Sequence, residues 1–100
     1  MTEELVEIRS AIDELDREIV ALIARRQRWV VKAGELKRGE KVDAVKAPAR
    51  VEGVIAQVRE LAADNGASPD VVEATYRAMI SAFIGLELSV HAEGAPDQVE

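Results

Sequence analysis

Three charged side chains occupy positions where a helical pattern calls for apolar ones. Arg26 follows Leu22 by four residues in an otherwise apolar stripe, and Glu87 follows Phe83 by four residues in another. Lys37 lies eleven residues after Arg26, so on one helix the two cations project within about 20° of each other. A buried charge is costly unless it is paired. These residues therefore indicate a site for a small anion with several oxygens, with Glu87 as a candidate active-site carboxyl group.

The same residues also have purely structural explanations. Arg26 can pair with a carboxylate from another helix, or extend its head group to the surface along its own aliphatic stem. Lys37, near the expected end of a helix, can simply complement the helix dipole. Glu87 can be the structural partner of Arg26. None of these residues predicts a function alone.

The elements that carry these residues are all predicted to be helices. Apolar residues alternate at spacings of three and four along residues 2–38, and no proline interrupts them. Gly39 is expected to end this helix. Pro48 is expected in the first turn of a second helix that Asp64-Asn65-Gly66 closes, and Ser68-Pro69 is expected to open a third. The chain is thus predicted to be all-α, with one domain over residues 1–92, a loop over 39–47 and a flexible tail over 93–100.

The length of the first predicted helix indicates a dimer. About 36 residues at ~1.5 Å each give ~54 Å. A compact chain of 100 residues has a radius of gyration of only about 13 Å. Two shorter helices cannot cover an apolar stripe of that length, so part of it must pack on another chain. A two-fold homodimer is the simplest solution.

Composition argues against several classes of function. The net charge is −6, whereas a nucleic-acid-binding surface needs a basic excess. The chain has no cysteine and one histidine, His91, which leaves no disulfide and no metal site of the usual kind. No apolar run reaches the length of a membrane span, and the N-terminus does not resemble a signal peptide. We expect a cytoplasmic protein that needs no cofactor.

Several motifs resemble the all-helical, AroQ-class chorismate mutases. The run from Glu7 to Asp16 is similar to the family's first-helix signature, and Ala24-Arg25-Arg26 with Lys37 matches its arginine and lysine spacing. Ala47 to Val51 resembles the start of the second helix, and Met79 to Glu87 resembles the active-site strip of the third. The resemblance covers residues 4–90 in order. It implies an intertwined homodimer that converts chorismate to prephenate in the shikimate pathway of aromatic amino acid biosynthesis.

The resemblance also implies a role for each candidate residue. Arg26 and Arg9 of the partner subunit clamp the two carboxylates of the substrate, and Lys37 binds a carboxylate and the ether oxygen. Arg50 lies at the pocket rim and closes it. Glu87, where many members have glutamine, is the opposing hydrogen-bond donor if it is protonated. The reaction is a cofactor-free [3,3] rearrangement, so it needs orientation and electrostatic stabilisation only.

Departures from the family pattern leave other activities open. Val51 stands where a glutamate that binds the ring hydroxyl is typical, and Ala47 stands where an aspartate is expected. Phe83 replaces a frequent serine and makes the expected pocket more apolar. The run before Val51 and the aromatic Phe83 also resemble isochorismate-pyruvate lyases, although those usually have glutamine at the position of Glu87. A 4-amino-4-deoxychorismate mutase and a non-catalytic helical dimerisation module are further alternatives, but such a module has no need of Arg26 in its stripe.

Overall fold

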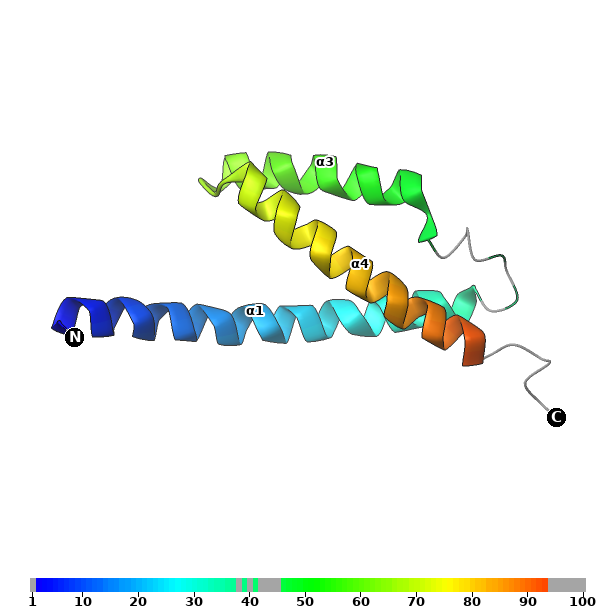
Figure 1. Cartoon of the computed structure of the whole chain (residues 1–100), viewed down its shortest axis with the longest axis horizontal. Coiled ribbons are helices and arrows are strands. Elements are labelled where there is room, and N and C mark those ends of the chain that lie inside the picture. Colours follow the sequence, from blue (N-terminus) through cyan, green and yellow to red (C-terminus); the bar gives the residue numbers. More distant parts are fainter. Residues whose placement is uncertain (1, 38, 40, 42–45, 94–100) are drawn as a thin grey trace.

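A computed structural model describes residues 2–37, 39, 41 and 46–93. Within these residues, three helices follow one another: α1 (Glu3–Leu36), α3 (Pro48–Asp64) and α4 (Pro69–Glu93) (Figure 1). No strand occurs among the described residues, so the all-α prediction is confirmed. The predicted helix boundaries agree with the observed ones to within two residues. Arg38, much of the predicted loop and residues 94–100 of the predicted tail lie outside the described residues, and the division into domain and tail stays a prediction.

Two of the helices begin at a residue whose side chain accepts a capping hydrogen bond. The Thr2 hydroxyl accepts a hydrogen bond from the backbone N–H of Leu5 at 3.2 Å, which satisfies one of the donors at the start of α1. The Ser68 hydroxyl does the same for Val71 at the start of α4, also at 3.2 Å, with Pro69 as the first helical residue. The prediction that Ser68-Pro69 opens the third helix is confirmed.

The turn between α3 and α4 depends on a glycine. Asn65 is the C-cap of α3, and Gly66 follows it with a φ of 75°, which side chains rarely tolerate. The backbone N–H of Ala67 then bonds the carbonyl of Ala62 at 2.8 Å. This six-to-one bond is the signature of a Schellman motif, and it reverses the chain tightly enough for α4 to pack back on α3.

The helix α4 packs against both α1 and α3 and so connects them. The buried apolar residues of the described chain lie on α3 and α4: Ile80 and Phe83 on α4, and Ile55, Val58 and Ala62 on α3. In Figure 1, α3 and α4 form a hairpin, and the C-terminal half of α4 crosses the C-terminal part of α1. The position of α3 relative to α1 is therefore set chiefly through α4.

Much of the apolar stripe of α1 is exposed in the single chain. The side chains of Ile8, Ile12, Leu15 and Ile19 are each about half exposed, and Trp29 is 72% exposed. The only residue of α1 that is buried is Gly34. Figure 1 shows the N-terminal half of α1 extending beyond the region where α4 crosses it. Among the described residues, no helix is both long enough and apolar enough to cross a membrane.

Candidate active site

A cavity of about 320 Å³ lies between the C-terminal half of α1, the beginning of α3 and the C-terminal half of α4. This volume is at the lower end of the range for small-molecule sites. Six of the seven side chains singled out in the sequence line it: Arg26, Lys37, Arg50, Val51, Phe83 and Glu87. Helix geometry explains part of this result, because Arg26 and Lys37 share a face of α1, while Phe83 and Glu87 are one turn apart on α4.

The carboxyl group of Glu87 is held by Lys37. Lys37 Nζ donates to Glu87 Oε2 at 2.9 Å, and the two side chains come from α1 and α4. Glu87 is only 8% exposed, so its charged side chain is buried. The alternative in which Glu87 is the structural partner of Arg26 is wrong, because the described ion pair joins Glu87 to Lys37. The pair lies in the wall of the cavity, so both side chains remain within reach of a ligand.

Arg26 lies instead against an aromatic ring. Its guanidinium carbon is 5.3 Å from the centre of the Phe83 ring, a distance typical of a cation–π contact. Such a contact positions the guanidinium without neutralising its charge. Phe83, which stands where serine is frequent in the family that the sequence resembles, therefore makes the pocket more apolar and also supports Arg26 at the cavity wall.

Positive charge exceeds negative charge around the cavity. Among the described lining residues, four are cations and one is a carboxylate, so these residues carry an excess of positive charge: Arg26, Lys37, Lys46, Arg50 and Glu87. Apolar side chains also line the cavity, among them Val54, Ile80 and Ile84. A partly apolar chamber with excess positive charge suits a compact organic anion better than a metal ion, since metal ions require negatively charged or neutral donor groups. Within the described residues, no group of three potential ligands is placed to hold a metal ion.

The rim of the cavity contains a strained backbone position. Ala47 has a φ of 37° and a ψ of 64°, the left-handed region, and it is the N-cap residue of α3 without a side-chain capping bond. An alanine in the left-handed region raises the free energy of the folded state. Residues with such strained backbone conformations are often found at functional sites. This conformation precedes Pro48 and sets the direction in which α3 leaves the loop. Arg50 follows Ala47 by three residues, in the first turn of α3, and it also lines the cavity.

Several lining residues were not singled out from the sequence. Trp29 and Ala33 were assigned to packing because they belong to the apolar stripe, Lys46 was treated as a loop charge, and Val30 was given no role. Helical spacing offered a signal for two others. Val54 is three residues after Val51, and Ile80 is three before Phe83, so each shares a face with a predicted site residue.

Arg9 is the one predicted site residue that the single chain does not bring to the cavity. It lies in α1 seventeen residues before Arg26, or about 25 Å along the helix axis. It is absent from the cavity wall. Its expected role requires a second copy of the chain and stays a prediction.

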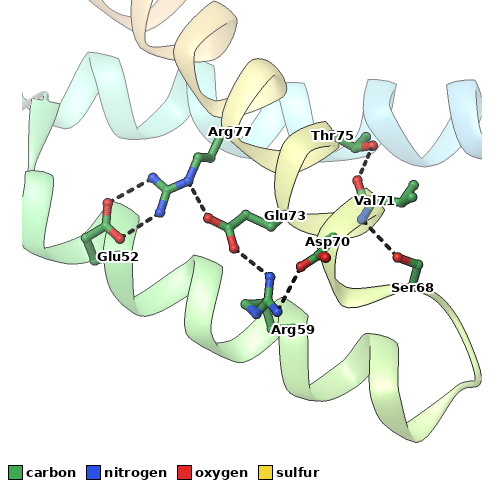
Figure 2. Close-up of polar contacts among 8 residues, drawn as sticks. All are labelled: Glu52, Arg59, Ser68, Asp70, Val71, Glu73, Thr75 and Arg77. Atoms are coloured by element: carbon green, nitrogen blue, oxygen red, sulfur yellow. Dashed lines mark hydrogen bonds and ion pairs between the residues drawn. The ribbon is translucent and has the colours of Figure 1, made fainter.

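A second cluster of charges joins α3 to α4 away from the cavity wall (Figure 2). We call it the α3–α4 ion network. Arg77 donates to both carboxylate oxygens of Glu52 at 2.9 Å and to Glu73 at 2.7 Å. Arg59 donates to Glu73 at 2.7 Å and pairs with Asp70 at 3.1 Å.

Two carboxyl groups of the α3–α4 ion network, those of Glu52 and Glu73, have a pKa below the usual value for glutamate. The hydrogen bond from Arg77 lowers the pKa of Glu52 below its usual value. Hydrogen bonds from Arg77 and then Arg59 lower the pKa of Glu73 in the same way. The network contains two cations and three carboxylates, so its positive charges are already matched and leave no excess for an anionic ligand.

The fold and cavity together define a class: a small all-helical protein whose helices enclose a cationic chamber for a small organic anion. The family model of chorismate mutase type II matches residues 8–88. The chain belongs to the chorismate mutase type II family, and the predicted family resemblance is confirmed. A relative from Pseudomonas aeruginosa named isochorismate pyruvate lyase is 32% identical over 84 residues, which cover 84% of this chain and 81% of that protein. No solved structure matches the chain significantly.

The family and its lyase relative place the chain among enzymes that use chorismate or a close isomer. Both names describe reactions of small dicarboxylate molecules. They leave the specific reaction to be inferred from the residues of this chain.

Proposed function

We propose that the protein is a chorismate mutase, which rearranges chorismate to prephenate without a cofactor. The observation that carries the proposal is the excess of positive charge around one partly apolar cavity, four cations against the single carboxylate of Glu87. A dicarboxylate restores the balance of charge, and the apolar wall accommodates its ring. The reaction would give the protein a role in aromatic amino acid biosynthesis. A location in the cytoplasm is part of the same proposal.

The reaction requires that the substrate be positioned and that negative charge on its ether oxygen be stabilised. In the [3,3] rearrangement the ether carbon–oxygen bond breaks while a carbon–carbon bond forms, and no external proton or electron is consumed. Arg26 binds a carboxylate and holds the side chain of the substrate over the ring, a contribution of orientation. Lys37 faces the ether oxygen, on which negative charge develops, and stabilises it electrostatically.

Glu87 completes this arrangement when it carries a proton. In the ligand-free chain its carboxylate accepts from Lys37 at 2.9 Å, so one oxygen placed between the two groups can contact both. The bound substrate brings its own negative charges and competes with Glu87 for Lys37. A protonated Glu87 then donates a hydrogen bond to the ether oxygen from the side opposite Lys37.

An isochorismate-pyruvate lyase is the second candidate, and Val51 is the observation that favours it. Val51 lines the cavity where a hydroxyl-binding glutamate is typical of the mutases, so that carboxylate is missing from the wall. The relative from Pseudomonas aeruginosa carries the name of this activity. The same cations serve a lyase, because it too breaks an ether bond in a compact dicarboxylate. A 4-amino-4-deoxychorismate mutase remains a third possibility.

Product analysis separates these activities. The purified protein is incubated with chorismate, isochorismate and 4-amino-4-deoxychorismate in turn, and the products are identified by chromatography and mass spectrometry. We expect prephenate from chorismate at the highest kcat/KM. Pyruvate and salicylate from isochorismate as the preferred reaction would replace the first proposal by the second. The variant Arg26→Gln, purified in the same way, controls for contaminating enzymes, and no turnover of any substrate would favour a non-catalytic dimerisation module.

We further propose that the active form is a homodimer in which two α1 helices lie antiparallel. The chain exposes 7497 Å², whereas a compact monomer of 10.9 kDa exposes about 5,600 Å². The excess of about 1,900 Å² on one chain is more than the roughly 800 Å² per partner that a specific interface of standard size buries. Its radius of gyration, 17.6 Å, also exceeds the ~13 Å of a compact chain of this length.

The charges along α1 favour the antiparallel direction. Residues 3–22 contain seven acidic residues and two basic ones, whereas residues 23–37 contain five basic residues and one acidic one. An antiparallel pair brings the acidic half of each helix beside the basic half of the other, and a parallel pair opposes like charges. This direction also carries Arg9 of the partner subunit toward Arg26, where it completes the clamp on the substrate.

Complementation between inactive variants tests the shared site. Arg9→Ala and Arg26→Ala are each expected to be nearly inactive as homodimers. A refolded equimolar mixture contains heterodimers with one site carrying both substitutions and one intact site, so about a quarter of the wild-type activity returns. No recovery, with dimers shown by sedimentation, would overturn the contribution of Arg9. Emission from Trp29, the single tryptophan, gives an independent readout and is expected to shift to the blue on association.

A further inference from the structure

Gly34 lies where α4 crosses the last turns of α1 (Figure 1). A Cβ atom at this position would meet Glu87 Cγ at 3.1 Å, the Glu87 carbonyl oxygen at 3.2 Å and Val90 Cβ at 3.3 Å. All three distances are shorter than the optimal separation of about 3.5–4.0 Å between non-bonded carbon atoms. One of the contacts is with backbone, so rotation of a side chain cannot relieve it. Any larger residue must therefore move α4 away from α1.

The same crossing holds the Lys37–Glu87 pair. Lys37 is three residues after Gly34, so the two lie on neighbouring turns of the same side of α1. Glu87 is both the residue that Gly34 contacts and the residue whose carboxylate accepts from Lys37 Nζ at 2.9 Å. A shift of α4 by a few tenths of an ångström moves the carboxyl group of Glu87 directly, because the contact is at its own Cγ and carbonyl.

We propose that Gly34 is a positioning residue of the candidate active site. By lacking a side chain, it lets α4 approach α1 at Glu87 and thereby sets the Glu87 carboxyl group against Lys37 in the cavity wall. The catalytic consequence of this inference rests on the proposed function, whereas its effect on the Lys37–Glu87 pair does not. A purely structural role for Gly34 would change stability without changing how that pair interacts.

The substitution Gly34→Ala has a matched control in Gly53→Ala. Both glycines lie inside helices, but a Cβ at Gly53 meets nothing within 4 Å. The higher helix propensity of alanine acts on both variants, so Gly53→Ala is expected to melt at the same or a higher temperature with unchanged activity. Gly34→Ala is expected to lower kcat about tenfold with little change in KM, because small misplacements of catalytic groups are costly. An unchanged kcat in Gly34→Ala would overturn the proposal.

A double-mutant cycle on stability tests the inference without any enzymatic activity. Lys37→Met, Glu87→Gln and the double variant are unfolded with denaturant, first in the parent chain and then in the Gly34→Ala background. We expect the coupling between positions 37 and 87 to be present in the parent and lost in Gly34→Ala. Equal coupling in both backgrounds would overturn the proposal even if the chain is an active mutase. If the chain turns over no substrate, the proposed function fails while this cycle still decides the role of Gly34.

A second variant covers the case in which Gly34→Ala does not fold. Glu87→Asp shortens the side chain by one methylene group and draws the carboxyl group away from Lys37, while Gly34 and the helix crossing stay as they are. It is expected to reproduce the loss of kcat with a normal melting temperature. A Glu87→Asp variant with the kcat of the parent would show that the placement of this carboxyl group does not matter, and the proposal would be wrong.

Discussion

The molecule contains two clusters of charge that differ in balance and in setting. In the α3–α4 ion network, two arginines meet three carboxylates, and each arginine has two carboxylate partners. Around the cavity, the described lining residues include four cations but one carboxylate, that of Glu87. The network is largely exposed, whereas Glu87 is buried against α1. A balanced, exposed cluster needs no ligand, but an unbalanced cluster in a partly apolar chamber is completed by an anion.

The comparison shows why counting charges alone does not find a site. Both clusters contain arginines from helices, and both join side chains of two different helices. They differ in what lies beside the charges. Exposed ion pairs contribute little because water screens them and because ordering two long side chains costs entropy. In the cavity, Glu87 is buried and Arg26 and Lys37 are partly buried, so these charges act more strongly on a ligand than fully exposed ones do.

The largest expected effect is the loss of a cation from the cavity. Lys37→Gln removes the positive charge that faces the ether oxygen, and we expect kcat to fall by roughly 10²–10³-fold, as for the loss of other groups that stabilise a developing negative charge. Steady-state kinetics with chorismate measures this loss. The matched change in the other cluster, Arg59→Gln, is expected to leave kcat within about twofold. Similar losses in both variants would mean that the two clusters do not differ in function.

A second experiment asks whether Glu87 acts as a hydrogen-bond donor. Only the protonated carboxyl group of Glu87 can donate, so kcat is expected to fall as rising pH removes this proton, with a limit of about tenfold per pH unit for a single proton. Glu87→Gln supplies an N–H donor at every pH and is expected to flatten the profile. The measurement is kcat against pH for both proteins. A wild-type profile without pH dependence would contradict this role for Glu87.

The smallest effect is expected in the α3–α4 ion network. Arg77→Gln removes the partner shared by Glu52 and Glu73 and is expected to lower the melting temperature by a few degrees at low salt and by less at high salt. Because folding lowers the pKa of both carboxyl groups, their contribution is present above the ordinary glutamate pKa of about 4.3 and is lost as pH falls through their lower folded values.

Thermal unfolding between pH 3 and pH 7 measures this contribution. The difference in melting temperature between the parent and Arg77→Gln is expected to shrink on acidification, because both carboxylates become protonated in the parent. A difference that stays constant over this range would assign the effect of Arg77 to packing of its aliphatic stem rather than to its charge.

Local chemistry in the sequence predicted the helices, whereas the predicted site residues make up six of the fourteen that line the cavity. Hydrophobic spacing, the Asn65-Gly66 turn and the Ser68-Pro69 start are local signals, and each acts within a few residues of itself. Helical periodicity also placed Arg26 and Lys37 on one face of α1. These predictions required no knowledge of which helices pack together. The length of α1 predicted an uncovered stripe for the same reason.

Only the tertiary structure decided which charges meet and at what distance. The sequence left Glu87 open to pairing with Arg26, but the crossing of α4 over α1 brings it to Lys37 and leaves Arg26 against Phe83. The network between Arg77 and Glu52 likewise joins residues 25 positions apart. Spacing along one helix fixes directions around its own axis, whereas contacts between helices depend on the crossing, which here is permitted by the missing side chain of Gly34.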